Sequence, residues 1–276
     1  MTLRDPAWTG LVDDAAIFPP GDVPLPDAVA AHVERREEWW SDLVGPFVVT
    51  DQRIPEIAQP LRLAVVVTGG AGAVEPAVRL AERTGHEVAG VEVALRDLDD
   101  LPGNARRVVT AAADCGVEPE RVYVELPHVP DTGSWLRAAD TVAEAGVRLK
   151  FRTGGLDASA FPATHALARW IDAALDRETP FKCTAGLHHA VAQEDSETGF
   201  GHHGFVNVML ATVRAFDGTP VDEVAALLGE RDPDVLASGA RAEDLGRARR
   251  WFTSFGSCSV TEPLDDLLAL GLLEKP

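Results

Sequence analysis

The fold is indicated first by residues 147–154, which read VRLKFRTG, and by residues 181–186, which read FKCTAG. Apolar and charged side chains alternate in both stretches with the period of two that is typical of a β-strand. The charged face holds Lys150, Arg152 and Lys182. In a barrel of parallel strands the outer face of the sheet is covered by helices and must be apolar. These three cations are therefore predicted to point into a barrel.

Short, valine-rich runs bounded by glycine, proline or aspartate recur along the chain, as expected for buried parallel strands. They lie at Ala15–Phe18, Phe47–Thr50, Leu63–Thr68, Val88–Leu95, Val122–Leu126, Val147–Thr153, Phe181–Ala185 and Phe252–Ser259. The segments between them carry apolar stripes at helical spacing, such as Trp135, Ala139 and Val142. This alternation predicts an α/β fold, a single (β/α)8 TIM barrel over residues 1–276. An open doubly wound sheet is the alternative, but no GxGxxG turn follows a strand.

The seventh and eighth predicted strands are separated by residues 186–251, which we interpret as a helical insertion in a βα loop. Helices are expected there near Phe205–Phe216, Val221–Leu228 and Ala242–Arg250. The first part of the insertion, Gly186 to His203, is polar and glycine-containing. It is predicted to be a mobile lid over the barrel mouth.

Composition limits the partners and the location. The formal net charge of −19 disfavours nucleic acid and anionic membranes, and a small-molecule substrate is expected instead. The three cysteines, Cys115, Cys183 and Cys258, lie far apart and form no CxxC pair, which fits a reducing compartment. No leader pattern precedes Pro20, and no apolar run approaches the roughly 20 residues that cross a bilayer. A cytoplasmic location is predicted, and a homo-oligomer is left open.

Two acidic residues join the inward-facing cations. Glu92 and Glu125 alternate with valines, so they too are predicted to point into the barrel. Charges inside a barrel persist only if they are paired, and they are best placed near the carboxyl ends of the strands, where barrel active sites lie. A purely structural ion-pair network is the alternative interpretation. Lys150 and Lys182 are expected to lower each other's pKa, which would supply a neutral amine for attack on a carbonyl.

Two adjacent acids lie before the first predicted strand. Asp13 and Asp14 are interpreted as exposed loop residues.

Three stretches resemble motifs of the deoxyribose-phosphate aldolases, a family of class I (Schiff-base) aldolase barrels. Residues 150–154, KFRTG, are similar to the Lys-x-x-Thr-Gly stretch that carries the Schiff-base lysine on the sixth strand. Residues 181–186 are similar to the Phe-Lys-x-x-Gly-Gly stretch that carries an activating lysine on the seventh. Residues 255–259, FGSCS, resemble the eighth-strand Phe-Gly-x-Ser-Ser, where phosphate is held. Glu92 falls where the family has an aspartate on the fourth strand.

The order and strand numbers of these motifs agree over roughly the last two-thirds of the chain. Several positions depart from the family pattern. Glu92 replaces a shorter acid, Cys183 and Thr184 replace a Pro-Ala pair, and Ala185 replaces a glycine. The insertion also separates the seventh and eighth strands, which would share the phosphate.

The resemblance implies a carbon–carbon lyase that acts on a small, anionic carbonyl substrate and needs no cofactor. Lys150 would form the Schiff base, Lys182 would lower the pKa of that amine, and Glu92 would relay protons. Glu125 completes the expected catalytic set. The residues expected to bind the substrate are Arg152, Thr153, Gly154, Thr184, Gly186, His188, Gly256 and Ser257.

Two other functions are left open. The pairs His188-His189 and His202-His203 flank several acids, so a metal-dependent hydrolase or isomerase that uses His188, His202 and Glu125 is one alternative. Neither pair has the HxH or HxxxH spacing that aims two imidazoles at one ion, so no metal is predicted. A non-catalytic barrel that binds a small acid is the other alternative.

Overall fold

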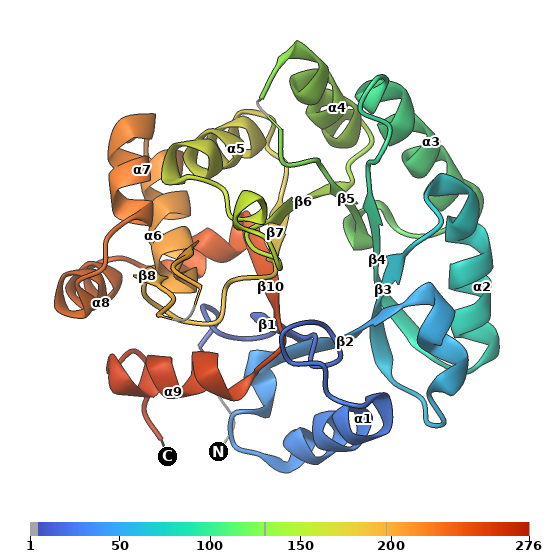
Figure 1. Cartoon of the computed structure of the whole chain (residues 1–276), viewed down its shortest axis with the longest axis horizontal. Coiled ribbons are helices and arrows are strands. Elements are labelled where there is room, and N and C mark those ends of the chain that lie inside the picture. The colour runs from blue at the N-terminus through green and yellow to red at the C-terminus, as the bar shows by residue number, and fades with distance from the viewer. Residues whose placement is uncertain (1–4, 130, 197, 276) are drawn as a thin grey trace.

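The computed structural model describes residues 5–129, 131–196 and 198–275. Within these residues, eight parallel strands close into a barrel in the order β1-β10-β7-β6-β5-β4-β3-β2, with helices around the outside (Figure 1). The strands are β1 (Val12–Asp14), β2 (Val44–Thr50), β3 (Arg62–Val67), β4 (Glu87–Ala94), β5 (Val122–Glu125), β6 (Arg148–Arg152), β7 (Phe181–Thr184) and β10 (Phe252–Ser257). The predicted TIM barrel is confirmed.

Helices follow the strands and bury their apolar stripes against the sheet. The α-helices are α1 (Leu25–Glu34), α2 (Val74–Arg83), α3 (Leu101–Asp114), α4 (Gly133–Glu144), α5 (Thr164–Asp176), α6 (Phe205–Phe216), α7 (Val221–Leu228), α8 (Pro233–Ala242) and α9 (Thr261–Ala269). The 3-10 turns are η1 (Arg35–Glu37), η2 (Ser41–Leu43), η3 (Asp51–Glu56), η4 (Ala71–Ala73), η5 (Pro119–Arg121), η6 (Ala158–Ala160) and η7 (Leu245–Arg250). None of the helices in the described part of the chain has the length and apolar character that crossing a bilayer requires.

The first strand lies earlier than predicted. Residues 15–18, the expected strand, form a turn in which the Phe18 N–H donates to the Ala15 carbonyl at 2.9 Å. The expectation that Asp13 and Asp14 are exposed is also wrong, because both are buried in β1. Asp14 is buried outside the barrel and is paired with His32 on α1 at 2.9 Å and with Arg35 at 2.7 Å.

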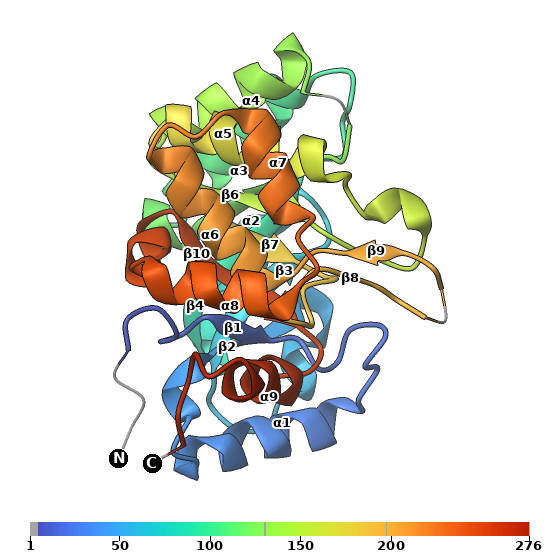
Figure 2. The same ribbon diagram turned by 90° about the vertical axis from the view of Figure 1, so that its left-hand side faces the viewer.

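Only the first part of the insertion lies at the barrel mouth. Its first part contains a short antiparallel hairpin of β8 (Gln193–Glu194) and β9 (Gly201–His202), which projects from the barrel in Figure 2. The following helices lie on the outside of the barrel, α6 and α7 beside α5 and α8 against α6. α6 and α7 have the predicted bounds.

The third helix expected in the insertion, near residues 242–250, is only the 3-10 turn η7, and the α-helix α8 that precedes it was not predicted. Asp232 starts α8 earlier by accepting the N–H groups of Asp234 and Val235, and Pro233 suits its first turn. Asp244 then accepts the Gly246 N–H and begins the separate turn η7.

Candidate active site in the barrel lumen

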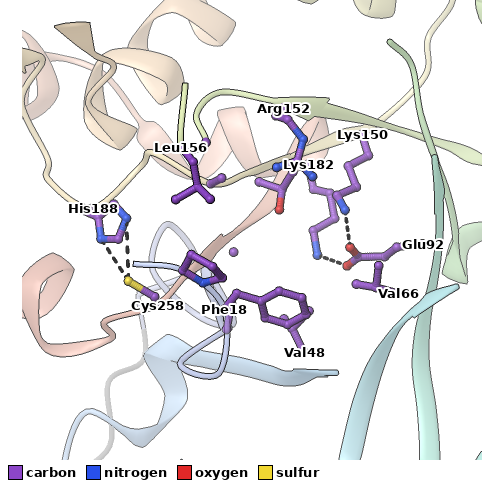
Figure 3. Close-up of a pocket in the computed structure, with 16 residues that line it drawn as sticks. Phe18, Val48, Val66, Glu92, Lys150, Arg152, Leu156, Lys182, His188 and Cys258 are labelled. Atoms are coloured by element: carbon purple, nitrogen blue, oxygen red, sulfur yellow. Dashed lines mark hydrogen bonds and ion pairs between the residues drawn. The ribbon is translucent and has the colours of Figure 1, made fainter. Parts of the chain in front are cut away.

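The two predicted lysines meet a single carboxylate in the lumen (Figure 3). Lys150 on β6 and Lys182 on β7 are paired in register on neighbouring strands. Glu92 Oε2 lies 2.7 Å from the Nζ of Lys150, and Glu92 Oε1 lies 2.6 Å from the Nζ of Lys182. β4 and β7 are not neighbours in the barrel, so this contact crosses the lumen. The prediction that these side chains point inward is confirmed.

The network continues from Lys150 toward solvent. Glu125 Oε2 lies 2.9 Å from the Nζ of Lys150, and Glu125 Oε1 accepts a hydrogen bond from the Nε of Arg152, also at 2.9 Å. The Lys150 side chain is 3% exposed, whereas that of Arg152 is 42% exposed. Arg152 is therefore the most exposed member of the network.

At the other end, Lys182 donates to Asp13 Oδ2, which also accepts a hydrogen bond from Ser254 Oγ at 2.9 Å. Neither Asp13 nor Ser254 was predicted as a site residue, and Asp13 was missed because a pair of adjacent acids resembles a loop. A signal was present: three inward cations were predicted with only two acids, and a buried cation needs a partner. Within the described residues, the network joins three cations to three carboxylates.

The carboxylates control the protonation of the lysines. Burial opposes charge on Lys150, but Glu125 and Glu92 outweigh it and hold the pKa of Lys150 above its ordinary value. Burial likewise opposes charge on Lys182, and Asp13 and Glu92 raise the pKa of that amine. The expected mutual lowering of the two pKa values is therefore wrong in its net result. Lys182 does act to lower the pKa of Lys150, but Glu125 and Glu92, in that order, outweigh it.

The three acids differ in their affinity for a proton. Burial favours the neutral form of Glu92, but Lys150 and Lys182 outweigh it and lower the pKa of Glu92 to about 2. The pKa of Glu125 is also lowered, since Lys150 and Arg152 outweigh its burial. Burial raises the pKa of Asp13 above its ordinary value, although Lys182 opposes the rise. Asp13 is therefore the carboxylate of the network that most readily accepts a proton.

A cavity of about 280 Å³ lies above the network at the barrel mouth. Lys150, Lys182 and Glu92 border one side, and Figure 3 shows Phe18 and Val48 lining an apolar wall below them. Of the predicted substrate-binding residues, Arg152, Thr184, His188 and Gly256 line this cavity. A polar end and an apolar wall suit a small molecule that carries one reactive polar group.

A second cavity of about 340 Å³ adjoins the first, and both are lined by Leu156 and His188. Gly186 lines this outer cavity rather than the inner one. The β8–β9 hairpin contributes Gln193 and His202 to its wall. The hairpin is thus placed where the lid was predicted, and its movement stays a prediction.

Four predicted site residues line neither of these cavities. Glu125 lies in the network below the inner one. Thr153 donates its hydroxyl proton to the Ala185 carbonyl at 2.6 Å, which ties the loops after β6 and β7 together. A side chain on Gly154 would come within 2.7 Å of the Cα of Gly186, so glycine permits those loops to touch. The Ser257 hydroxyl is buried and accepts the Ser259 N–H at 3.3 Å.

The four histidines of the insertion have separate partners. The Nδ1 of His188 lies 3.1 Å from Glu262, and the Nδ1 of His189 lies 3.1 Å from Asp266. His202 packs against Phe161 with ring centroids 4.6 Å apart.

His203 Nε2 is 2.8 Å from the Pro162 carbonyl oxygen. Across the described ranges, no group of three or more His, Cys, Asp or Glu side chains is placed to hold a metal ion. Both oxygens of Glu125 already contact cations, so the ligand set of the metal-hydrolase alternative is not assembled.

The barrel alone does not assign a reaction, because this fold carries many unrelated chemistries. The residues of the lumen supply the functional argument: two amines, three carboxylates and a small cavity beside them. In comparisons with known proteins, the chain matches no protein-family model and no curated protein.

Proposed function

We propose that the protein is a carbon–carbon lyase of the aldolase type, in which Lys150 forms a Schiff base with a small carbonyl substrate. The observation that carries the proposal is the position of Lys150. Its amine borders an internal cavity and lies 2.7 and 2.9 Å from two carboxylates, with a second lysine one strand away. An amine in contact with proton acceptors, beside a cavity that admits a carbonyl compound, is what imine formation requires.

Lys150 must lose a proton before it attacks, because its raised pKa keeps the amine charged. Glu92 contacts Lys150 and Lys182, and Lys182 contacts Asp13. Lys182 can give a proton to Asp13 and take one from Glu92, while Glu92 takes one from Lys150. The net result is a neutral Lys150 and a protonated Asp13, the acid whose pKa burial raises.

The neutral amine then adds to the substrate carbonyl, and water leaves as the imine forms. A protonated imine accepts the electron pair of the carbon–carbon bond that breaks, which gives an enamine, while the hydroxyl on the departing carbon gives its proton to a carboxylate of the network and becomes the second carbonyl product. Arg152 lines the cavity and is partly exposed, so its guanidinium is placed to hold an anionic end of the substrate.

Borohydride trapping tests the proposal, and the chain offers its own control. It contains three lysines, Lys150, Lys182 and Lys275, and Lys275 is exposed near the C-terminus. The protein is incubated with a panel of small aldehydes and ketones, reduced with borohydride, and mapped by peptide mass. We expect an adduct on Lys150 that exceeds the one on Lys275 and disappears in Lys150→Met. Labelling of Lys275 alone across the panel would reject the lyase.

A barrel that binds a small acid without catalysis is the second candidate. It is favoured by the complete pairing of the network and the raised pKa of both lysines. Calorimetric titration with small carboxylic acids separates the two candidates. Binding that needs Arg152, together with no trapped imine, would favour this function over the lyase.

A further inference from the structure

A thiol, an imidazole and a carboxylate lie together on the side of the cavity away from the lysines. Cys258 follows β10 and His188 follows β7, and both line the inner cavity (Figure 3). Cys258 Sγ lies 3.7 Å from Nδ1 and 3.9 Å from Nε2 of His188. Glu262, in the first turn of α9, places Oε2 3.1 Å from Nδ1 of the same ring.

The carboxylate determines which imidazole nitrogen can act as a base. When Nδ1 of His188 carries the ring proton, Glu262 accepts a hydrogen bond from it and the lone pair is on Nε2. Cys258 Sγ is nearly equidistant from the two nitrogens, so a side-chain rotation must bring it to Nε2, the nitrogen that can accept the thiol proton. The 3.9 Å separation of Sγ and Nε2 is long, but such contacts commonly shorten when a ligand binds. After that rotation, nucleophile, base and orienting acid would stand in the order of a catalytic triad.

Burial raises the pKa of the Cys258 thiol, and the charge of Glu262 acts in the same direction. The thiol is therefore neutral until His188 takes its proton. Reactivity at Cys258 should for this reason depend on His188.

We propose that Cys258, His188 and Glu262 form a reactive thiol site, which adds to the electrophilic carbon of a small aldehyde held in the cavity. The choice of an aldehyde rests on the proposed function; the thiol site itself does not. The thiol proton passes to Nε2 of His188, and the sulfur forms a bond with the carbonyl carbon. The π electrons of the carbonyl move to oxygen, which takes the proton back from His188. The product is a hemithioacetal, formed reversibly and without oxidation or reduction.

The other two cysteines serve as internal references. Cys183 lies on β7 and is 0% exposed. Cys115, at the end of α3, is partly buried, and its thiol donates to the Ala112 carbonyl at 3.3 Å. Cys115 thus reports the reactivity of a partly buried thiol hydrogen-bonded to the backbone, and Cys183 reports unfolding.

Brief alkylation of the full-length protein with iodoacetamide, followed by peptide mass mapping, tests the site. We expect Cys258 to react at least about tenfold faster than Cys115, while Cys183 stays unmodified. His188→Gln should slow Cys258 about tenfold and leave Cys115 unchanged. The matched control is His189→Gln, the adjacent histidine that pairs with Asp266, and it should leave both rates unchanged.

Equal rates for Cys258 and Cys115, or an unchanged ratio in His188→Gln, would overturn the proposal. If Cys183 reacts in His188→Gln, that variant has lost its fold. Glu262→Gln then takes its place, and an unchanged ratio of the Cys258 rate to the Cys115 rate would overturn the proposal. Added propanal should protect Cys258 in the wild type and in Lys150→Met; a lack of protection in both rejects the aldehyde as the electrophile. Fast alkylation that depends on His188 without any imine on Lys150 would reject the lyase and keep the thiol site.

Discussion

Glu92 is the residue on which the lumen depends most, because each of its carboxylate oxygens holds one buried ammonium group. Glu92→Gln keeps the shape of the side chain but removes the charge between Lys150 and Lys182. Breaking a buried ion pair in this way costs about 3–5 kcal/mol. We expect the free energy of unfolding to fall by that amount in urea titrations at pH 7.

A matched control lies on the same strand. Glu87 pairs with Arg62 at 3.2 Å on the surface, where both side chains are more than half exposed. Glu87→Gln should change the free energy of unfolding by less than about 1 kcal/mol. Similar losses in the two variants would mean that the lumenal network contributes no more to stability than a surface pair.

At the scale of elements, the end of β7 shows how the chain turns over the cavity. Ala185 has a φ of +61° and Gly186 a φ of +76°, so two successive residues adopt the left-handed conformation. This conformation suits glycine and costs an alanine about 1–2 kcal/mol. Alanine also allows the unfolded chain fewer conformations than glycine does. The chain therefore loses less entropy on folding, which offsets part of that cost.

Ala185→Gly should therefore stabilise the protein slightly, by up to about 1 kcal/mol. Ala185→Val should destabilise it, since a β-branched residue tolerates a positive φ poorly. Urea unfolding of both variants beside the wild type measures these effects. A large loss in Ala185→Gly would show that the methyl group of Ala185, which lines the cavity, contributes more packing than conformational strain.

Much of the barrel could be predicted, because most strands are valine-rich runs whose period of two survives in the structure. β1 could not, since it has three residues and two of them are acids. Their burial depends on Lys182 and His32, partners far away in the sequence. α8 was missed because local capping by Asp232, rather than a long apolar stripe, places its start.

The site shows the same division between local and distant causes. The inward direction of Lys150 and Lys182 follows from local alternation, so it was predicted correctly. The net shift of their pKa values depends on carboxylates from three other strands, and no spacing along the chain reveals their distances. No role at the site was predicted for Cys258 for a similar reason, because His188 and Glu262 reach it only through the fold.

For the whole molecule, the network makes stability depend on pH. The pKa of Glu92 is about 2 in the folded protein, below the roughly 4.3 of an unfolded chain. Glu92 therefore contributes stability above about pH 4.3, and this is lost as the pH falls toward 2, by about 3 kcal/mol in total. Glu125 acts in the same direction.

Asp13 acts in the opposite direction, since its raised pKa stabilises the fold at low pH and loses that effect as the pH rises. The difference between wild type and Glu92→Gln isolates the contribution of Glu92. We expect the two unfolding free energies to approach each other in urea titrations as the pH falls from about 5 through 3 toward 2. A constant difference over that range would mean that Glu92 is not held as a depressed-pKa carboxylate.

The closure of the barrel has a consequence for synthesis in the cell. β1 pairs with β2 and with β10, so the first strand of the barrel must wait for the last one before its second neighbour is made. Until β10 is made, no strand lies between β1 and β7 to position Asp13 beside Lys182. The nascent chain therefore cannot assemble its interior charges stepwise from the N-terminus. A product cut short before β10 would keep an open sheet edge and unpaired lumenal ions, which are features that chaperones and proteases recognise.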